Sequence, residues 1–322
     1  MNSTAQNARL LRLATTWSVA TAGLLIVVKL GAWIETGAVS LLASLIDSLM
    51  DVAASIINLV AVRYSLRPAD EEHRFGHGKA ESLAALTQAA FITGSALLLS
   101  FEAVDRLINP QVIEQPLIGI WVMVFAIVAT MVLLGVQRHV VAKTGSLAIK
   151  ADSVHYKTDL LTNIATIAAI MLAVVGWTQA DALFGLGIAA YILWSAFHIG
   201  RSAAQHLMDH ELSVDAQQKI IDIALAHPEV RGVHELRTRQ SGQTPFIQLH
   251  IELDGYMTLS KAHHIGDEVE DMIKTAMPGA DVLIHQDAGD DSPPDHPGGR
   301  MQSSDISQAD SDMEIDRPDE KT

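Results

Sequence analysis

The chain contains no cysteine among its 322 residues and has few charged side chains. The absence of cysteine excludes disulfide bonds, thiol catalysis and cysteine-based zinc sites, so any metal site must use histidine and carboxylate ligands. Charged residues make up only 18% of the chain, whereas hydrophobic residues make up 49% and gather in long runs. This composition is typical of a membrane protein.

Six apolar runs are long enough to cross a bilayer, whose hydrocarbon core of about 30 Å requires roughly 20 mostly apolar residues in a helix. The first run lacks a small-residue cleavage site and is too long for a signal peptide, so we expect it to be retained as a helix. The six expected membrane helices cover residues 13–34, 40–64, 82–106, 116–137, 146–177 and 180–203.

Lysine and arginine gather in every second connection between these runs. Arg12 precedes the first run, Arg67 follows the second, and Arg138 follows the fourth. The intervening connections hold little beyond Arg106. By the positive-inside rule, both termini are expected in the cytoplasm.

The residues after the sixth run have the pattern of a small soluble domain. The segment KIIDIALAHP predicts a helix, GVHELRTRQ and PFIQLHIELDG predict strands, LSKAHHIGDEVEDMIKTAM predicts a helix, and ADVLIHQD predicts a strand. This αββαβ order indicates an open α/β sandwich. We therefore expect an α-helical membrane protein with six transmembrane helices and a C-terminal cytoplasmic α/β domain.

The C-terminal end is strongly acidic. Residues 287–322 hold eleven of the 37 acidic residues but only three of the 22 basic ones. Such a segment buries too little apolar surface to fold, so a disordered tail is expected. The predicted parts of the chain are an N-terminal cytoplasmic segment 1–12, a transmembrane domain 13–209, a cytoplasmic domain 210–288 and a tail 289–322.

Two carboxylates interrupt the second apolar run, in the sequence SLIDSLMDVAAS. Asp47 and Asp51 are four residues apart, so they project from one face of a helix. A carboxylate at the bilayer centre costs about 2.5–3.5 kcal/mol on insertion scales. The pair therefore requires a compensating cation.

The fifth run, HYKTDLLTN, supplies a second pair at the same spacing, His155 and Asp159. Because runs two and five are antiparallel, Asp51 is expected level with His155, and Asp47 level with Asp159. Three carboxylates and one imidazole suit a tetrahedral zinc ion. A lone intramembrane Asp is often a structural hydrogen-bonding residue, but two matched pairs are harder to explain in that way.

Metal and protons compete for these four side chains, because the ligands must be deprotonated to bind a metal. If the site opens alternately to the two sides of the membrane, this competition couples outward metal flux to inward proton flux. The predicted mechanism is metal/proton antiport with alternating access.

Several longer motifs extend this interpretation: DSLMD, RPADEEHRFGHGKAESLAAL, ADSVHYKTDLLTN, LRTRQSGQTPFIQLHIELDG and VLIHQD. In these motifs, which span about residues 10–287, the chain resembles the cation diffusion facilitator family, most closely its bacterial YiiP/FieF-type branch. The resemblance implies a homodimeric exporter of zinc and similar divalent ions (cadmium, ferrous iron or manganese) in the bacterial inner membrane, with a metallochaperone-like cytoplasmic domain. The transport site of the family would match Asp47, Asp51, His155 and Asp159.

The resemblance also implies a second metal site in the loop after the second run, at Asp70, His73 and His77. The segment DEEHRFGHGK offers one carboxylate and two imidazoles in a short glycine-containing stretch, which suits an open and exchangeable site. The alternative is a basic cytoplasmic loop whose histidines are merely solvated.

A third site is implied in the soluble domain. In VLIHQD, His285 and Asp287 are two residues apart and share a strand face, while His250 lies opposite the apolar face of its own strand. The resemblance implies a two-metal site at the dimer interface, made of His234, His250, His263, His285 and Asp287. Any one of these histidines alone would more often be a surface residue.

Other functional classes remain open at this point. A metal-gated channel or a non-transporting metal sensor would use the same ligands. An intramembrane metalloprotease would require H-E-x-x-H, but neither His210 nor His234 begins that motif, and neither lies in an apolar run. No enzymatic activity, organic cofactor or nucleic-acid partner is expected; the expected partners are divalent metal ions, protons, the bilayer and a second copy of the chain.

Overall fold

The computed structural model describes residues 3–36, 39–108, 116–174 and 180–289. The chain forms two compact units, which divide after Leu207. The expected acidic tail lies outside the described residues, apart from Gly289.

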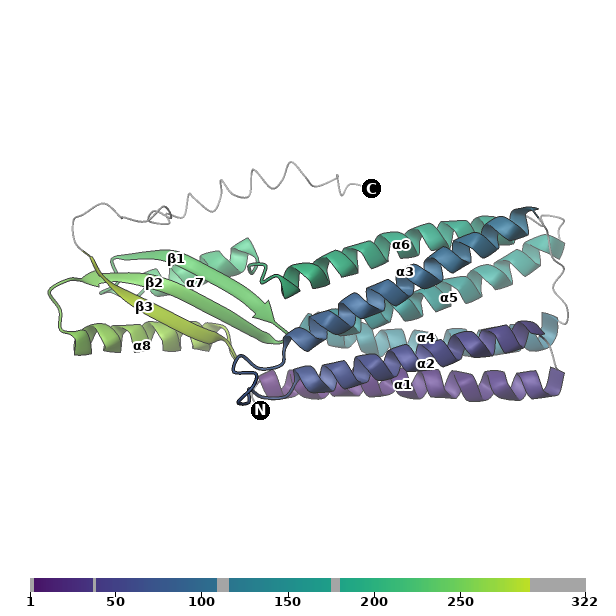
Figure 1. The fold of residues 1–322 in the computed structure, drawn as a ribbon, viewed down its shortest axis with the longest axis horizontal. Coiled ribbons are helices and arrows are strands. Elements are labelled where there is room, and N and C mark those ends of the chain that lie inside the picture. Colours follow the sequence, from purple (N-terminus) through teal and green to yellow (C-terminus); the bar gives the residue numbers. More distant parts are fainter. Residues whose placement is uncertain (1–2, 37–38, 109–115, 175–179, 290–322) are drawn as a thin grey trace. The chain divides into compact units, whose positions relative to one another are not determined.

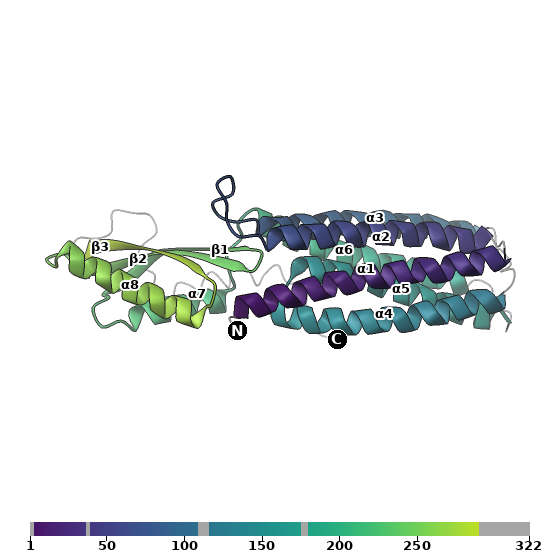
Figure 2. The ribbon, with the colours of Figure 1, turned by 90° about the horizontal axis from the view of Figure 1, so that it is seen from below.

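The described part of the first unit consists of six long helices (Figures 1 and 2): α1 Ser3–Thr36, α2 Val39–Ser65, α3 Lys79–Ile108, α4 Pro116–Thr144, α5 Leu147–Val174 and α6 Ala180–Leu207. Each corresponds to one of the expected runs, but α1 begins ten residues earlier than expected and α4 continues to Thr144. Hydropathy detects only the part of a helix that faces lipid, whereas backbone hydrogen bonding continues into the polar region. Residues 3–12, expected as a separate segment, are the first turns of α1.

Within the described residues, five of these helices are long and apolar enough to cross a membrane: α1, α2, α3, α4 and α6. The remaining helix, α5, has 28 residues, and its first half carries four charged side chains, Lys150, Asp152, Lys157 and Asp159. Charge at this density in a membrane helix indicates function, because each charge requires a partner inside the bundle.

The surface of the first unit is apolar and its interior is built from small residues. Leu98, Phe101 and Trp121 are each more than 70% exposed, which is unfavourable in water but natural in lipid. Alanines are buried throughout the bundle, and a Cβ atom on Gly185 of α6 would lie only 3.1 Å from the Cβ atom of Ala103 on α3. Such close contact through small residues is typical of membrane helix packing.

The second unit has the predicted αββαβ order: α7 Val214–Leu225, β1 Gly232–Ser241, β2 Thr244–Asp254, α8 Leu259–Ala276 and β3 Asp281–Gly289. The sheet order is β1-β2-β3, with β1 antiparallel and β3 parallel to β2. The tight β1–β2 turn uses Gly242 at φ 57°, a left-handed conformation that glycine adopts without strain.

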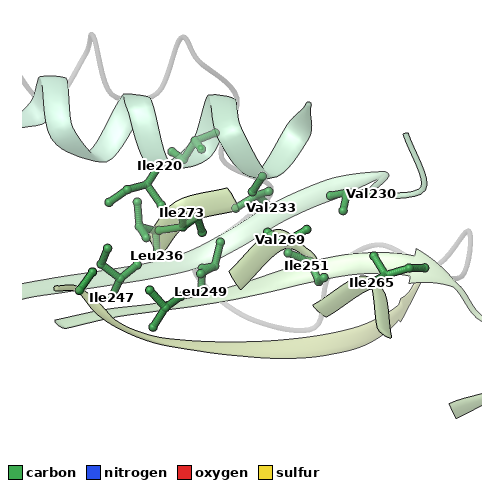
Figure 3. Close-up of a cluster of buried hydrophobic side chains, with 14 of the residues drawn as sticks. Ile220, Val230, Val233, Leu236, Ile247, Leu249, Ile251, Ile265, Val269 and Ile273 are labelled. Atoms are coloured by element: carbon green, nitrogen blue, oxygen red, sulfur yellow. The ribbon is translucent and has the colours of Figure 1, made fainter. Parts of the chain in front are cut away.

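The core of this unit lies on one face of the sheet, under both helices (Figure 3). Four alternate residues of β2, Ile247, Leu249, Ile251 and Leu253, are at most 2% exposed, which confirms the apolar face expected from the sequence. Ile220 of α7 and Ile273 of α8 pack against the same cluster. Because side chains alternate along a strand, the intervening residue His250 points to the face that the helices leave open.

Candidate metal centres

The first candidate site lies between α2 and α5. Nε2 of His155 is 3.0 Å from Oδ1 of Asp51 and 4.0 Å from Oδ2 of Asp159. Asp51 and His155 are each only 9% exposed. One ligand atom from each of the three residues lies within 4.8 Å of the others. Asp51 is level with His155, the pairing that antiparallel helices predict.

Asp47 is not part of this close group. It lies one turn before Asp51 on α2, and its side chain is exposed. Its charge still interacts with those of Asp51, His155 and Asp159. The structure therefore brings three of the four expected ligands together and places the fourth beside them.

A lysine from α1 also reaches this region. Nζ of Lys29 donates hydrogen bonds to Oγ of Ser48, at 2.6 Å, and to the backbone oxygen of Ser44, at 3.2 Å. Its charge interacts with Asp47 and Asp159. Sequence reasoning required a cation for the buried acids but did not identify Lys29. The available signal was its position inside the first apolar run, where an uncompensated lysine is costly.

The second candidate site is the loop between α2 and α3. The carboxylate of Asp70 lies 3.4 Å from Nδ1 of His73 and 3.2 Å from Nε2 of His77. The loop reverses at Gly76, whose φ of 77° suits glycine, and the amide of Gly76 donates to the backbone oxygen of His73. All three expected residues therefore meet within one short turn.

Backbone hydrogen bonds stabilise the ionised form of Asp70. Oδ1 of Asp70 accepts the amide hydrogen of His73 at 2.7 Å and that of Glu72 at 3.1 Å. The hydrogen bond from His73 is the main cause that lowers the pKa of Asp70 below its ordinary value. His77 is buried, and its Nδ1 has no hydrogen-bond partner among the described residues. A charged carboxylate beside two imidazoles is a suitable donor set for a divalent cation.

The third candidate site is a row of histidines across the sheet of the second unit. His234 of β1 pairs with His250 of β2, which pairs in turn with His285 of β3. Asp287 contacts all three: its Oδ2 lies 3.1 Å from Nε2 of His234 and 2.8 Å from Nδ1 of His250, and its Oδ1 lies 3.3 Å from Nε2 of His285. Four of the five expected residues therefore meet on the open face.

Within one copy of the chain, His263, the fifth expected residue, lies apart from the other four. It lies on α8, which packs on the opposite face of the sheet, and its side chain is 71% exposed. Its Nδ1 is 3.8 Å from Oδ1 of Asp267. Its neighbour His264 lies 3.3 Å from Glu268 instead.

Two glutamates near the histidine row were missed by the sequence analysis. Oε2 of Glu235 lies 3.8 Å from Nε2 of His250, and Oε1 of Glu252 lies 3.8 Å from Nδ1 of His234. Simple alternation places Glu235 on the face opposite His234, but the strand register shifts between His234 and Arg237, and Glu235 adopts φ 47°. This bulge turns Glu235 toward the row, and no single-sequence pattern reveals it.

The comparisons with known proteins agree with this architecture. Residues 15–208 match the family model for the cation efflux transmembrane domain, and residues 212–288 match that for the cation efflux protein cytoplasmic domain. The chain belongs to the cation diffusion facilitator family. This membership makes it a multi-pass membrane transporter and not an enzyme, which removes the metalloprotease alternative.

Relatives within the family are similar over most of their length. The cation-efflux pump FieF of Yersinia enterocolitica is 51% identical over 282 residues, which are 88% of this chain and 94% of that protein. FieF of Pectobacterium atrosepticum is 51% identical over 280 residues, which are 87% of this chain and 93% of that protein. A solved nickel form of the MamM CTD is 26% identical and covers 24% of this chain and all of its own, but its TM-score of 0.24 is too low to support a structural comparison.

Proposed function

We propose that this family member exports divalent metal cations, zinc first among them, in exchange for protons. The observation that carries the proposal is the convergence of Asp51, His155 and Asp159 between two antiparallel helices of a cation efflux domain. Relatives named as cation-efflux pumps, half identical over nearly their whole length, support the direction of transport.

The donor set favours zinc or a similar borderline cation as the substrate. Zinc accepts imidazole nitrogen and carboxylate oxygen at roughly 2.0–2.2 Å in a four-coordinate shell. The proposed fourth ligand is Asp47, one turn before Asp51 on α2. Magnesium requires six oxygen ligands and retains its water, so an imidazole-containing site suits it poorly. Cadmium, ferrous iron and manganese remain candidate cargoes, because this donor set accepts them as well.

Proton exchange follows from the same three side chains. Without metal, a proton between His155 and Asp51 offsets the repulsion between the neighbouring carboxylates. Metal binding requires that proton to leave, since the ligands bind a metal only when deprotonated. A site that is occupied by either metal or protons and opens alternately to each side exchanges one for the other.

The soluble unit is proposed to join two copies of the chain in the cytoplasm. The histidine row lies on the sheet face that α7 and α8 leave uncovered, where a second copy can contribute ligands such as His263. A metal bound only by the paired form stabilises the dimer by mass action. We place both termini in the cytoplasm of a bacterial cell and the helices in its inner membrane, and the Asp70 loop at the cytoplasmic entrance to the transport site.

Zinc transport into proteoliposomes under an imposed proton gradient tests the proposal. Wild-type protein is compared with Asp51→Asn and His155→Gln, and with the matched controls Asp105→Asn on α3 and His198→Gln on α6. We expect the first two variants to lose transport and the controls to retain it. Transport that survives both site substitutions refutes the site, zinc flux that ignores the proton gradient indicates a channel, and zinc binding without flux indicates a sensor.

A further inference from the structure

A second buried polar cluster lies in the first unit, separate from the metal ligands. Asp152 of α5, Ser18 of α1 and Gln137 of α4 are each at most 1% exposed. Oδ2 of Asp152 accepts hydrogen bonds from Oγ of Ser18, at 2.6 Å, and from Nε2 of Gln137, at 2.7 Å. The same Nε2 lies 3.0 Å from Oγ of Ser18. Three helices therefore meet at one carboxyl oxygen.

The other oxygens of this cluster are unsatisfied. Among the described residues, neither Oδ1 of Asp152 nor Oε1 of Gln137 has a hydrogen-bond partner, although both are buried. Both atoms are acceptors when the carboxyl group is ionised, so they cannot bond to each other. Two buried acceptor oxygens without a donor, one on the Asp152 carboxyl group and one on the Gln137 amide, are energetically unfavourable, since buried polar atoms are almost always hydrogen-bonded.

Among the described residues, no lysine or arginine forms an ion pair with Asp152. Its partners on α1 and α4, Ser18 and Gln137, are neutral. The charged groups that act on it are His155, one turn along α5, and Asp51 of α2. His155 is already engaged with Asp51 at 3.0 Å, and Asp51 repels a second anion. An unpaired buried carboxylate is strongly unfavourable.

We propose that Asp152 is protonated in this conformation, with its proton on Oδ1 directed at Oε1 of Gln137, and that it carries protons during transport without binding metal. One proton satisfies both orphaned oxygens and converts the pair into a carboxylic acid–amide ring with two hydrogen bonds. The second part of the proposal rests on the metal/proton exchange proposed above.

Ser18 and Tyr156 connect the surroundings of Asp152 to helix α2. The hydroxyl of Tyr156 donates to the backbone oxygen of Ser18 at 3.2 Å and lies 2.8 Å from Oγ of Ser55. Ser55 is one turn beyond Asp51 on α2. Loss of the proton from Asp152 breaks one of its two bonds to Gln137 and weakens the contact of α5 with α4, so protonation of Asp152 changes how the helix that holds His155 and Asp159 is packed.

Infrared spectroscopy of the metal-free full-length protein tests the protonation state. We expect the wild type at neutral pH to show a carbonyl band of a protonated carboxylic acid that shifts in D₂O and is missing in Asp152→Asn. Asn preserves the shape and both partners of Asp152, so the variant should fold. In Gln137→Leu, which keeps Asp152 but removes its acceptor, the band should move toward that of a free acid. A spectrum unchanged by Asp152→Asn overturns the proposal, as does a band unchanged by Gln137→Leu.

Proteoliposomes with an internal pH dye test the role in transport. Asp152→Asn is expected to keep zinc affinity and zinc flux but to move about one proton fewer per zinc ion. An unchanged proton-to-zinc ratio refutes the carrier role, and a large loss of zinc affinity shows that Asp152 acts on the metal instead. If the wild type moves zinc without protons, the proposed exchange itself fails, while the infrared result still decides the state of Asp152.

Discussion

Replacement of His155 by alanine should abolish most of the zinc affinity of the transport site. His155 supplies the only imidazole in the group, and its Nε2 lies within 4.0 Å of both Asp51 and Asp159. Apparent binding free energies of structural zinc sites are about 10–16 kcal/mol. Shared among four ligands, this amounts to about 2.5–4 kcal/mol for each, or roughly a 100- to 1000-fold loss of affinity on removal of one.

Isothermal titration calorimetry with zinc measures this loss directly. The variant His198→Ala provides a matched control, because His198 lies on α6 and its Nδ1 lies 2.9 Å from the backbone oxygen of Trp194, away from the acidic residues of the transport site. The loop and the histidine row also bind zinc in our proposal, so the titration is performed in a background in which His77 and His234 are replaced by alanine. Affinity in His155→Ala within a few-fold of the control would refute the assignment of His155 as a ligand.

Three further predictions concern the surrounding charges and the other two sites. Lys29→Met should strengthen zinc binding at the transport site, since it removes a neighbouring cation, whereas Lys29→Arg should not; equal affinities would show that Lys29 is only structural. Asp70→Asn should weaken zinc binding at the loop by more than the roughly 10- to 100-fold loss typical of removing a residue that only supports a ligand. Because the pKa of Asp70 is lowered, mainly by the amide hydrogen bond from His73, its carboxylate stays ionised as pH falls through the ordinary Asp range, so a pH series should show no loss of loop binding through protonation of Asp70 in that range. Asp287→Ala should reduce zinc-dependent dimerisation in analytical ultracentrifugation, with His264→Ala as the control; dimerisation that is equally zinc-dependent in both would remove the row from the interface.

Much of the fold could be predicted from the sequence because it depends on local patterns. Apolar runs of sufficient length specify helices in lipid, and the alternation of apolar residues in β2 specifies a strand with one buried face. The four-residue spacing of Asp47 and Asp51, and of His155 and Asp159, places each pair on one helix face in any context. The class of metal that these residues suit follows from their ligand types, three carboxylates and one imidazole, which the sequence gives directly.

The sequence could not specify the contacts that depend on how separate elements pack. The contact between Lys29 and Ser48 depends on how α1 packs against α2. The bulge at Glu235 interrupts the alternation of side chains that a strand pattern assumes, and so changes the face on which Glu235 lies. The position of His263 away from the histidine row likewise follows from the side of the sheet that α8 covers.

By itself, then, the sequence determined that this is a helical membrane transporter with a small α/β domain, and it identified three groups of side chains with the chemistry to bind divalent cations. Only the tertiary structure decided which of those side chains meet, and it alone brought Asp152 together with Ser18 and Gln137. The reason is physical: residue spacing along a helix or strand is fixed by local backbone geometry, whereas distances between elements are set by packing that involves the whole domain.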